Sequence, residues 1–340
     1  MNNKIKIALL GVLAMVVIYL LFYKKDSEVS SKSLKDFAIK DTANIDRIFL
    51  ADNDGNQSLI SRQADGTWMV NDKWRAKDNN VFLLLRGFYN MEVKSPVVAD
   101  AIPAILKQIS AKPIKVEVYM KGQEKPEKIY YFGFATADHY GNYALLEIPG
   151  EGKSKEPYIV KEAGFYGFIR PRLITREDEW RYDGIFDYPD MDIASIKVDY
   201  PQHIDESIDI KWNGGNDISL LNKAGEPYQS FDTLTVKSYI RLYKKIHIES
   251  FRNYLNQAQE DSVLNSTEPI AYVSVSDRSG ETVSVTIYNK GYIDPYARLE
   301  EFDNLDPERY YILTEDNQLV IAQRLQWEPL LVPQNAFRPE

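Results

Sequence analysis

The segment 165–186, FYGFIRPRLITREDEWRYDGIF, gathers six aromatic residues among four arginines near the middle of the 340-residue chain. Rings and guanidinium groups are enriched in binding hot spots, and Arg also stacks on aromatic faces. A groove built from these side chains would bind a carbohydrate or an anion. The candidate binding residues are Arg170, Arg172, Arg176, Trp180, Arg181 and Tyr182. The favoured alternative is a linker whose rings join two domains.

Three other groups of residues could support chemistry, and each has a simpler explanation. Asp52-Asn53-Asp54-Gly55 resembles the opening of a calcium loop but lacks the closing bidentate Glu, so it predicts a hairpin turn. The three histidines, His139, His203 and His247, have no metal-ligand spacing, and His139 is expected in a surface loop. Paired carboxylates could hydrolyse a glycoside. The acidic cluster is Glu300, Glu301, Asp303, Asp306 and Glu308, and its sequence favours a solvated loop.

Recurrent catalytic motifs are absent from the sequence. It contains no G-x-S-x-G, Walker A, G-x-G-x-x-G or H-E-x-x-H pattern, and no Cys. The lack of Cys excludes disulfides, thiolate nucleophiles and iron–sulfur clusters. We therefore expect no catalytic residue, no metal site and no cofactor, and we predict a protein that is not an enzyme.

The charge distribution argues against nucleic acid as a partner. Residues 26–340 hold 37 Lys and Arg against 50 Asp and Glu, a net charge of −13. A body this acidic repels phosphate backbones.

The N-terminus predicts a membrane anchor within residues 1–25. No charge interrupts the run from Ile7 to Tyr23, which includes Leu13 and Val17, and lysines flank it on both sides. A cleaved signal peptide is the alternative, but no small-residue cleavage site follows the run. We expect residues 7–23 to lie in the lipid bilayer of the inner membrane, as a single pass with the body on the periplasmic side. Residues 26–40 are expected to form a tether.

The body shows a spacing that repeats about 150 residues later. Val81, Leu84, Leu85 and Phe88 have the i, i+3, i+4, i+7 spacing of one helix face. The same spacing recurs, at an offset of 155, in Val236, Tyr239, Ile240 and Tyr243, with Asp78 and Thr233 as the expected N-caps. Further pairs at offsets of 148 to 157 are Ile45/Ile193, Val116/Val273, Tyr158-Ile159-Val160/Tyr311-Ile312-Leu313 and Arg172-Leu173/Arg324-Leu325.

This series predicts a tandem duplication of an α+β unit, each copy having a mostly antiparallel β-sheet and one main helix. The expected boundaries are 41–175 for the first unit, 176–190 for a junction and 191–340 for the second unit. Hairpin turns are predicted at Asp54-Gly55, Asp65-Gly66, Gly214-Gly215, Ala224-Gly225 and Ser279-Gly280.

Residues 40–175 resemble the bacterial domain-of-unknown-function family 4340. The resemblance is carried by Ile45–Leu50, by Asp65-Gly66-Thr67-Trp68-Met69-Val70, by the helix at Val81–Asn90, by Lys128-Ile129-Tyr130-Tyr131-Phe132-Gly133 with Tyr143, and by Pro157-Tyr158-Ile159-Val160. It implies a single-anchor envelope protein, of a kind often encoded beside gliding-motility-type ABC transporter components. These are packing and turn motifs, so the resemblance transfers no catalytic residue.

Three Asp-Thr/Ser-aliphatic triplets, at residues 41–43, 232–234 and 261–263, look like the O-glycosylation acceptor of Bacteroidota periplasmic proteins.

Taken together, these features of the sequence predict an anchored, non-enzymatic cell-envelope protein that binds a protein partner, plausibly of a transport complex. Two alternatives stay open. One is a periplasmic module that binds a glycan or a small ligand at the aromatic–Arg segment, and the other is an envelope polysaccharide hydrolase.

Overall fold

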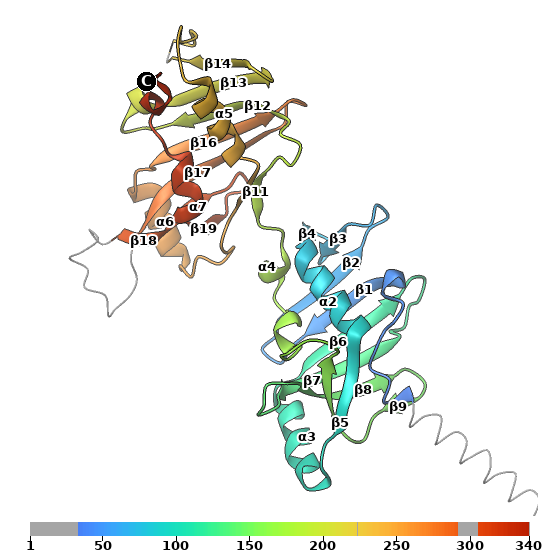
Figure 1. Cartoon of the computed structure of the whole chain (residues 1–340). Helices are drawn as coiled ribbons and strands as arrows, with labels where there is room; N and C mark the ends of the chain where they lie inside the picture. The colour runs from blue at the N-terminus through green and yellow to red at the C-terminus, as the bar shows by residue number, and fades with distance from the viewer. Residues whose placement is uncertain (1–32, 223, 292–304, 340) are drawn as a thin grey trace, which may run out of the picture. The chain divides into compact units, whose positions relative to one another are not determined.

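The computed structural model describes residues 33–222, 224–291 and 305–339. These residues form an α+β structure with antiparallel sheets and six α-helices, and the chain divides into two compact units (Figure 1). Unit 1 ends at Tyr182 and unit 2 begins at Asp183. The predicted junction, 176–190, is therefore shared: its first seven residues belong to unit 1 and the rest to unit 2.

Unit 1 contains one large sheet. Its strands are β1 (Ile45–Ala51), β2 (Gln57–Arg62), β3 (Trp68–Val70), β4 (Trp74–Arg75), β5 (Met91–Pro96), β6 (Ile114–Met120), β7 (Lys128–Ala135), β8 (Asn142–Ile148), β9 (Gly152–Lys153) and β10 (Tyr158–Glu162). Their order is β4-β3-β2-β1-β6-β7-β8-β10-β5, with β9 paired to β8. Alternate residues of β6, Ile114, Val116 and Val118, are buried because one face of the sheet covers the core.

Unit 2 contains a seven-stranded sheet and a two-stranded one. Its strands are β11 (Gly184–Asp187), β12 (Ile193–Asp199), β13 (Ile208–Gly214), β14 (Asp217–Leu221), β15 (Lys245–His247), β16 (Ala271–Asp277), β17 (Thr282–Gly291), β18 (Leu305–Leu313) and β19 (Leu319–Gln323). The larger sheet has the order β14-β13-β12-β16-β17-β18-β19, and β11 pairs with β15.

The central strand pairs of the two units share their register. Ile48 of β1 lies opposite Val118, and Ile196 of β12 lies opposite Val275. Residues related by an offset of 148 in the first strand and of 157 in its partner strand thus lie opposite each other in both units. Both first strands also carry a register shift at their start, between Ile45 and Arg47 in β1 and between Ile193 and Ser195 in β12.

All five predicted turns join or follow strands as expected. Glycine is needed where the backbone has positive φ, as at Gly55 (φ 87°) between β1 and β2 and at Gly280 (φ 92°) between β16 and β17. Asp52 illustrates why the calcium-loop pattern is a turn. One of its carboxylate oxygens accepts the backbone N–H of Asp54 at 2.9 Å and that of Asn56 at 3.1 Å.

Three helices belong to unit 1: α2 (Asp78–Asn90), α3 (Ile102–Ala111) and α4 (Glu177–Trp180). The predicted face of α2 is buried on the sheet through Val81, Leu84 and Phe88. The α3 helix covers part of the other sheet face, where Ile105 and Ile109 pack with Leu145.

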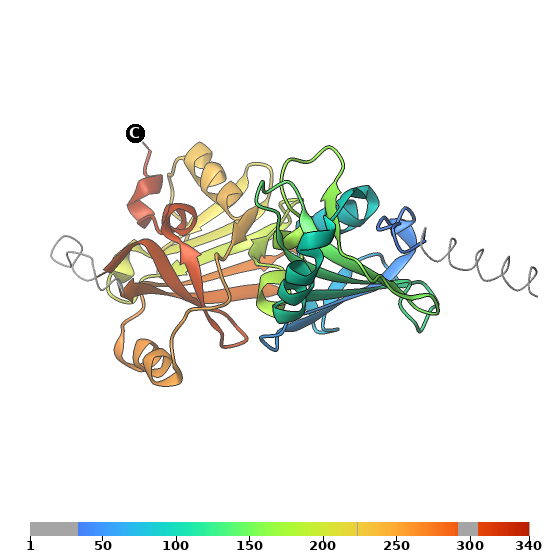
Figure 2. The same ribbon diagram turned by 90° about the horizontal axis from the view of Figure 1, so that it is seen from below.

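The helices of unit 2 are α5 (Thr233–Leu242), α6 (Gln257–Ser266) and α7 (Arg324–Trp327). Figure 2 shows α5 and α6 on opposite sides of the larger sheet. Val236, Tyr239 and Ile240 of α5 are buried in the main core, whereas α6 covers a smaller cluster that includes Tyr311 and Ile321.

Four details correct the sequence analysis. First, α3 and α6 give each unit a second long helix, which was not predicted. Second, the N-caps lie one residue earlier than expected. Asp232, not Thr233, caps α5 by accepting the N–H groups of Leu234 and Thr235, and α2 is preceded by Lys77, which makes no side-chain cap bond.

Third, the expected tether is shorter than 26–40, because residues 33–40 are built into unit 1. Phe37 and Ile39 are buried in its core, and the hydroxyl of Tyr130 donates to the carbonyl of Phe37 at 2.8 Å. The lysine side chain of Lys128 donates to the carbonyl of Ala38 at 2.7 Å. The remaining tether residues, 26–32, lie outside the described residues.

Fourth, two of the offset pairs occupy different places. Tyr158 begins β10, whereas Tyr311 lies in β18, and these strands hold different positions in their sheets. Leu173 is buried, whereas Leu325 is 87% exposed.

Candidate functional site

The predicted aromatic–Arg group is mostly engaged inside unit 1. Trp180 is completely buried in the core, and its indole N–H donates to the carbonyl of Ile174 at 2.8 Å. Its ring is therefore not offered to a ligand. The guanidinium of Arg170 donates to the carbonyls of Gly133 at 3.0 Å and Phe132 at 3.3 Å, so it braces β7.

The remaining residues of the group have partners in the same unit. Arg176 pairs with Asp178 and, at 3.1 Å, with Glu179. Arg181 lies 3.7 Å from the ring centre of Trp74, and the guanidinium of Arg75 lies 4.5 Å from that of Tyr182. The structure does not bring Trp180, Tyr182 and the arginines together as the walls of one groove.

Arg172 leads to a different and more exposed place. Its guanidinium pairs with the buried carboxylate of Glu162, the last residue of β10, and lies 4.5 Å from the ring centre of Phe165. The other carboxylate oxygen of Glu162 accepts the Nε–H of Arg86 from α2 at 2.9 Å. A buried carboxylate between two guanidinium groups keeps its charge compensated. This arrangement holds Arg172 beneath an aromatic loop.

The aromatic loop, residues 163–168, is fixed at both ends. At its start, the N–H of Ala163 donates to the carbonyl of Asn90 at 2.9 Å. After its end, the buried side chain of Asn142 accepts the N–H of Ile169 at 2.7 Å and that of Arg170 at 3.1 Å. Anchored ends allow the loop to expose aromatic rings without the whole segment becoming mobile.

A tight turn between β7 and β8 places Tyr140 beside this loop. Asp138 accepts hydrogen bonds from Lys94, from the hydroxyl of Thr136 and from the N–H of Tyr140. These bonds, led by that from Lys94, hold the pKa of Asp138 well below its usual range. The carboxylate thus stays ionised and keeps the turn closed.

The loop and the turn enclose a depression of about 330 Å³, here named the aromatic depression. Its lining residues are Lys94, Tyr140, Lys161, Gly164, Phe165 and Tyr166. The rings of Tyr140 and Tyr166 meet edge to face, 5.8 Å apart, and Tyr166 is 86% exposed. Lys94 pairs with Asp138 at 2.7 Å, and Lys161 pairs with Glu92 at 3.1 Å.

None of the six candidate binding residues lines this depression. Phe165 and Tyr166 lie in the aromatic–Arg segment but were not among those candidates, and the lysines and Tyr140 come from other strands and turns. One signal was present: Phe165 and Tyr166 stand between Gly164 and Gly167, both with positive φ. Two rings in such a glycine-bounded turn cannot both reach a core.

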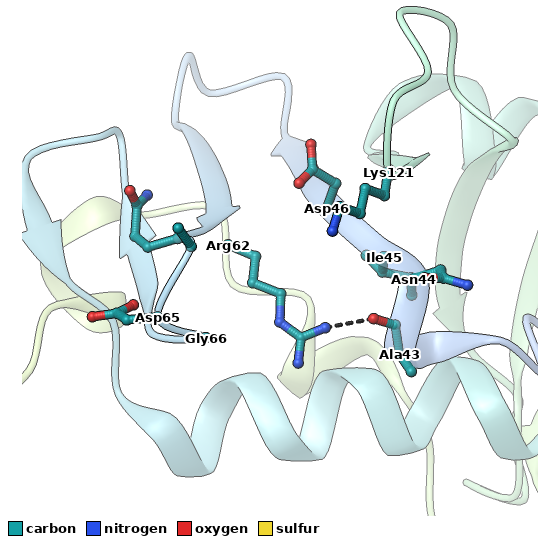
Figure 3. A pocket seen from close by; sticks show the side chains of 10 residues that line it. Ala43, Asn44, Ile45, Asp46, Arg62, Asp65, Gly66 and Lys121 are labelled. Carbon is teal, nitrogen blue, oxygen red and sulfur yellow. Dashed lines mark hydrogen bonds between the residues drawn. The ribbon is translucent and has the colours of Figure 1, made fainter.

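A second depression in unit 1, of about 540 Å³, is polar (Figure 3). Arg62 donates to the carbonyl of Ala43 at 2.5 Å, and Asp46, Asp65 and Lys121 also line the space. Cations and carboxylates alternate around it without a common orientation, so its lining specifies no ligand class.

The acidic residues considered for chemistry form ion pairs where the structure describes them. Within the described ranges, no group of three His, Cys, Asp or Glu residues could hold a metal ion. Asp306 pairs with Lys290 at 2.8 Å, and Glu308 pairs with Arg309 at 3.0 Å. The other acids of that cluster, Glu300, Glu301 and Asp303, lie outside the described residues.

The histidines remain separate from one another. His139 lies in the β7–β8 turn with φ 57°, and His247 contacts Asp183 at 2.9 Å. His203 is exposed just before a short 3₁₀ helix, Ile204–Glu206.

The predicted anchor residues, Ile7, Leu13, Val17 and Tyr23, lie outside the described residues. Among the helices of the described part, none is long and apolar enough to cross a bilayer.

Comparison of the chain with protein-family models, with curated proteins and with solved structures gives no match. Function is therefore argued from the geometry of this chain.

Proposed function

We propose that this chain is a non-enzymatic, membrane-anchored protein of the bacterial cell envelope that binds a protein partner, a component of a transport complex. Residues 7–23 would anchor it in the inner membrane with units 1 and 2 on the periplasmic side. The observation that carries the proposal is the aromatic depression: exposed rings, backed by paired cations and held by a fixed frame.

The shape of the depression favours a protein partner over a sugar. A sugar ring stacks best on a flat, exposed aromatic face, whereas Tyr140 and Tyr166 meet edge to face, with interplanar angle 76°. A corner of rings suits an inserted apolar side chain, and Tyr is enriched in hot spots. No carboxylate lines the depression, so it offers no acid and base for glycoside hydrolysis.

We also propose that the two units arose by tandem duplication and that the chain belongs with family 4340. The common strand order and the shared register of the first strands support the duplication. The resemblance of residues 40–175 supports the family, whose single-anchor character agrees with the anchor expected here.

The test is recovery of partners from native membranes in a mild detergent, using the full-length chain. Tyr166→Ala is expected to reduce stoichiometric recovery of the partner by about tenfold, as the loss of a hot-spot ring does. Tyr140→Ala should have a similar direction of effect. Tyr272→Ala is the matched control, because Tyr272 of unit 2 is 46% exposed and Tyr140 is 47% exposed.

Equal recovery with all three variants would overturn the proposal. Specific retention of the wild-type chain on envelope glycan, abolished by Tyr166→Ala, would replace it with the glycan-binding alternative.

A further inference from the structure

The outward face of α2 is aromatic, although its inward face already fills the core. Phe82 is 58% exposed and Tyr89 is 47% exposed. They are seven residues apart, so they lie on one side of the helix about 10 Å from each other. A surface helix of a globular protein normally presents polar residues on this side. The two rings therefore call for an explanation other than folding.

Unit 2 supplies the comparison. At the offset of 155 that aligns the buried faces of α2 and α5, Phe82 corresponds to Lys237 and Tyr89 to Lys244. Lys237 is partly exposed and bonds the side chain of Asn216. Lys244 follows the end of α5 (Thr233–Leu242), so the comparison shows only that a helix in this setting does not require a ring at the position of Phe82.

Arg86 connects this face to the aromatic depression. Its guanidinium lies 5.9 Å from the ring centre of Phe82 and also bonds Glu162. Glu162 in turn holds Arg172 beneath Phe165. Phe82 and the aromatic loop are therefore linked through one buried carboxylate, which ties the position of α2 to that of the loop.

The charges around the rings of α2 and the aromatic depression are mainly positive. Five cations adjoin its rings or line the depression: Lys40, Arg86, Lys94, Lys161 and Arg172. Their carboxylate partners are Glu92, Asp138 and Glu162, which leaves an excess of two positive charges. The whole chain has a net charge of −9, so this excess is local. Opposite charge on a partner would be attracted to it.

We infer that α2 and the aromatic depression together receive an acidic amphipathic helix of the partner protein, an inference that rests on the proposed function. Two rings seven residues apart match the repeat with which one helix packs along another. Carboxylates beside the apolar stripe of the incoming helix would meet the cations that flank the rings.

The test is photo-crosslinking in native membranes with the full-length chain. A benzophenone amino acid is placed singly at positions 82, 89 and 166, with positions 237 and 244 as matched controls. We expect positions 82 and 166 to crosslink the same protein, within one segment that has apolar residues at i, i+3 or i+4 spacing and acidic residues beside them. The control positions should not crosslink it.

A double variant tests the energetic part of the inference. Phe82→Lys with Tyr89→Lys copies unit 2 and should reduce crosslinking from position 166 by about tenfold. Raising the salt concentration from 50 to about 500 mM should weaken crosslinking several-fold because exposed charges are screened. Phe82→Ala with Tyr89→Ala, which adds no charge, should reduce it in the same direction.

Several outcomes overturn the inference. Crosslinking of position 82 to lipid identifies a membrane-facing helix, and crosslinking to a second copy identifies self-association. A salt-independent yield excludes the acidic partner. If position 166 captures a partner and position 82 does not, the proposed function stands and the extension along α2 fails. If neither captures a protein, both fail.

Discussion

The two units of this chain have a similar order of central strands but differ in what α2 and α5 present to solvent. The inner faces of α2 and α5 are both buried and apolar, as Leu84 and Ile240 illustrate. Their outer faces differ: α2 exposes Phe82 and Tyr89, whereas α5 exposes Leu234 and Leu242 and has Lys237 at the position of Phe82. Core packing constrains the inner face in both units. The outer face is free of that constraint, so core packing does not account for its difference.

The net charges of the two units also differ. Residues 33–182 carry 22 Lys and Arg against 21 Asp and Glu, a net charge of +1, whereas residues 183–340 carry 14 against 27, a net charge of −13. A strongly acidic unit stays solvated and repels other acidic surfaces. Unit 1 is nearly neutral, so it does not repel an acidic surface in this way.

The largest expected effects concern a feature that the units share. Trp180 and Trp327 are both completely buried, and each indole donates to a backbone carbonyl at 2.8 Å, that of Ile174 and that of His247. Trp180→Ala and Trp327→Ala should each destabilise their own unit by about 3–5 kcal/mol, since each leaves a cavity and an unpaired carbonyl. Calorimetry combined with hydrogen exchange would show which unit loses protection.

Loss of protection in both units with either variant would mean that the units unfold as one, and the comparison between them would then apply to surfaces only.

A second pair of variants compares two residues that the sequence offset pairs but that differ in burial. Leu173 and Leu325 have equivalent positions by sequence offset, but only Leu173 is buried. Leu173→Ala should cost about 2–4 kcal/mol, and Leu325→Ala less than about 0.5 kcal/mol. Denaturant midpoints of the two variants measure the difference. Similar costs would mean that the two leucines make similar contacts in solution and would restore the sequence pairing.

Local patterns predicted much of the fold. The buried helix faces follow from the spacing of residues such as Val81 and Leu84, and the turns follow from Asp-Gly and Gly-Gly pairs, because both depend on short-range geometry. The helix α6 was missed because its apolar residues, such as Val263 and Leu264, are few and its outward side is polar. The N-cap of α5 was misplaced by one residue because Asp and Thr stand side by side and both can cap.

The site was harder to predict because it depends on long-range pairing. The place of Tyr140 beside Tyr166, and of Lys94 beside Tyr140, follows from the order β8-β10-β5, which no local pattern contains. The aromatic–Arg segment was recognised as unusual from composition. Composition does not separate Trp180, which fills a core, from Tyr166, which is exposed.

A smaller effect should distinguish unit 2 by its pH dependence. Burial of Asp306 opposes its ionisation, but hydrogen bonds from Lys290 and from the N–H of Glu308 outweigh this and lower its pKa. The pair therefore stabilises unit 2 fully above the unfolded pKa of about 3.9, and this stabilisation is lost as the pH falls through the lower folded pKa. Asp306→Asn should cost about 1.5–3 kcal/mol at pH 7, the usual worth of a hydrogen bond to a charged group.

The measurement is the thermal midpoint of unit 2 between about pH 2 and pH 7. Asp306→Asn should flatten the acid limb of this curve for unit 2 while leaving unit 1 unchanged. A variant with the same acid limb as the wild-type chain would assign that limb to other carboxylates.

The smallest expected effect comes from transferring the rings. Lys237→Phe with Lys244→Tyr places the two rings at the offset positions of unit 2, one in α5 and one just after it. We nevertheless expect this variant to capture none of the partner when Phe82 and Tyr89 are replaced by lysine. In unit 1 a loop of six residues, 163–168, separates β10 from Ile169 and supplies Phe165 and Tyr166. In unit 2, β19 runs directly into α7 at Arg324, so no such loop stands beside the helix.

Crosslinking from position 237 in the transferred variant measures this outcome. Capture of the partner there would show that two rings on a helix are sufficient and that the aromatic depression contributes little. Failure to capture it, with full capture by the wild-type chain, would place specificity in the combination of α2 with the loop. That combination is the one structural element that unit 1 has and unit 2, in its described residues, lacks at this position.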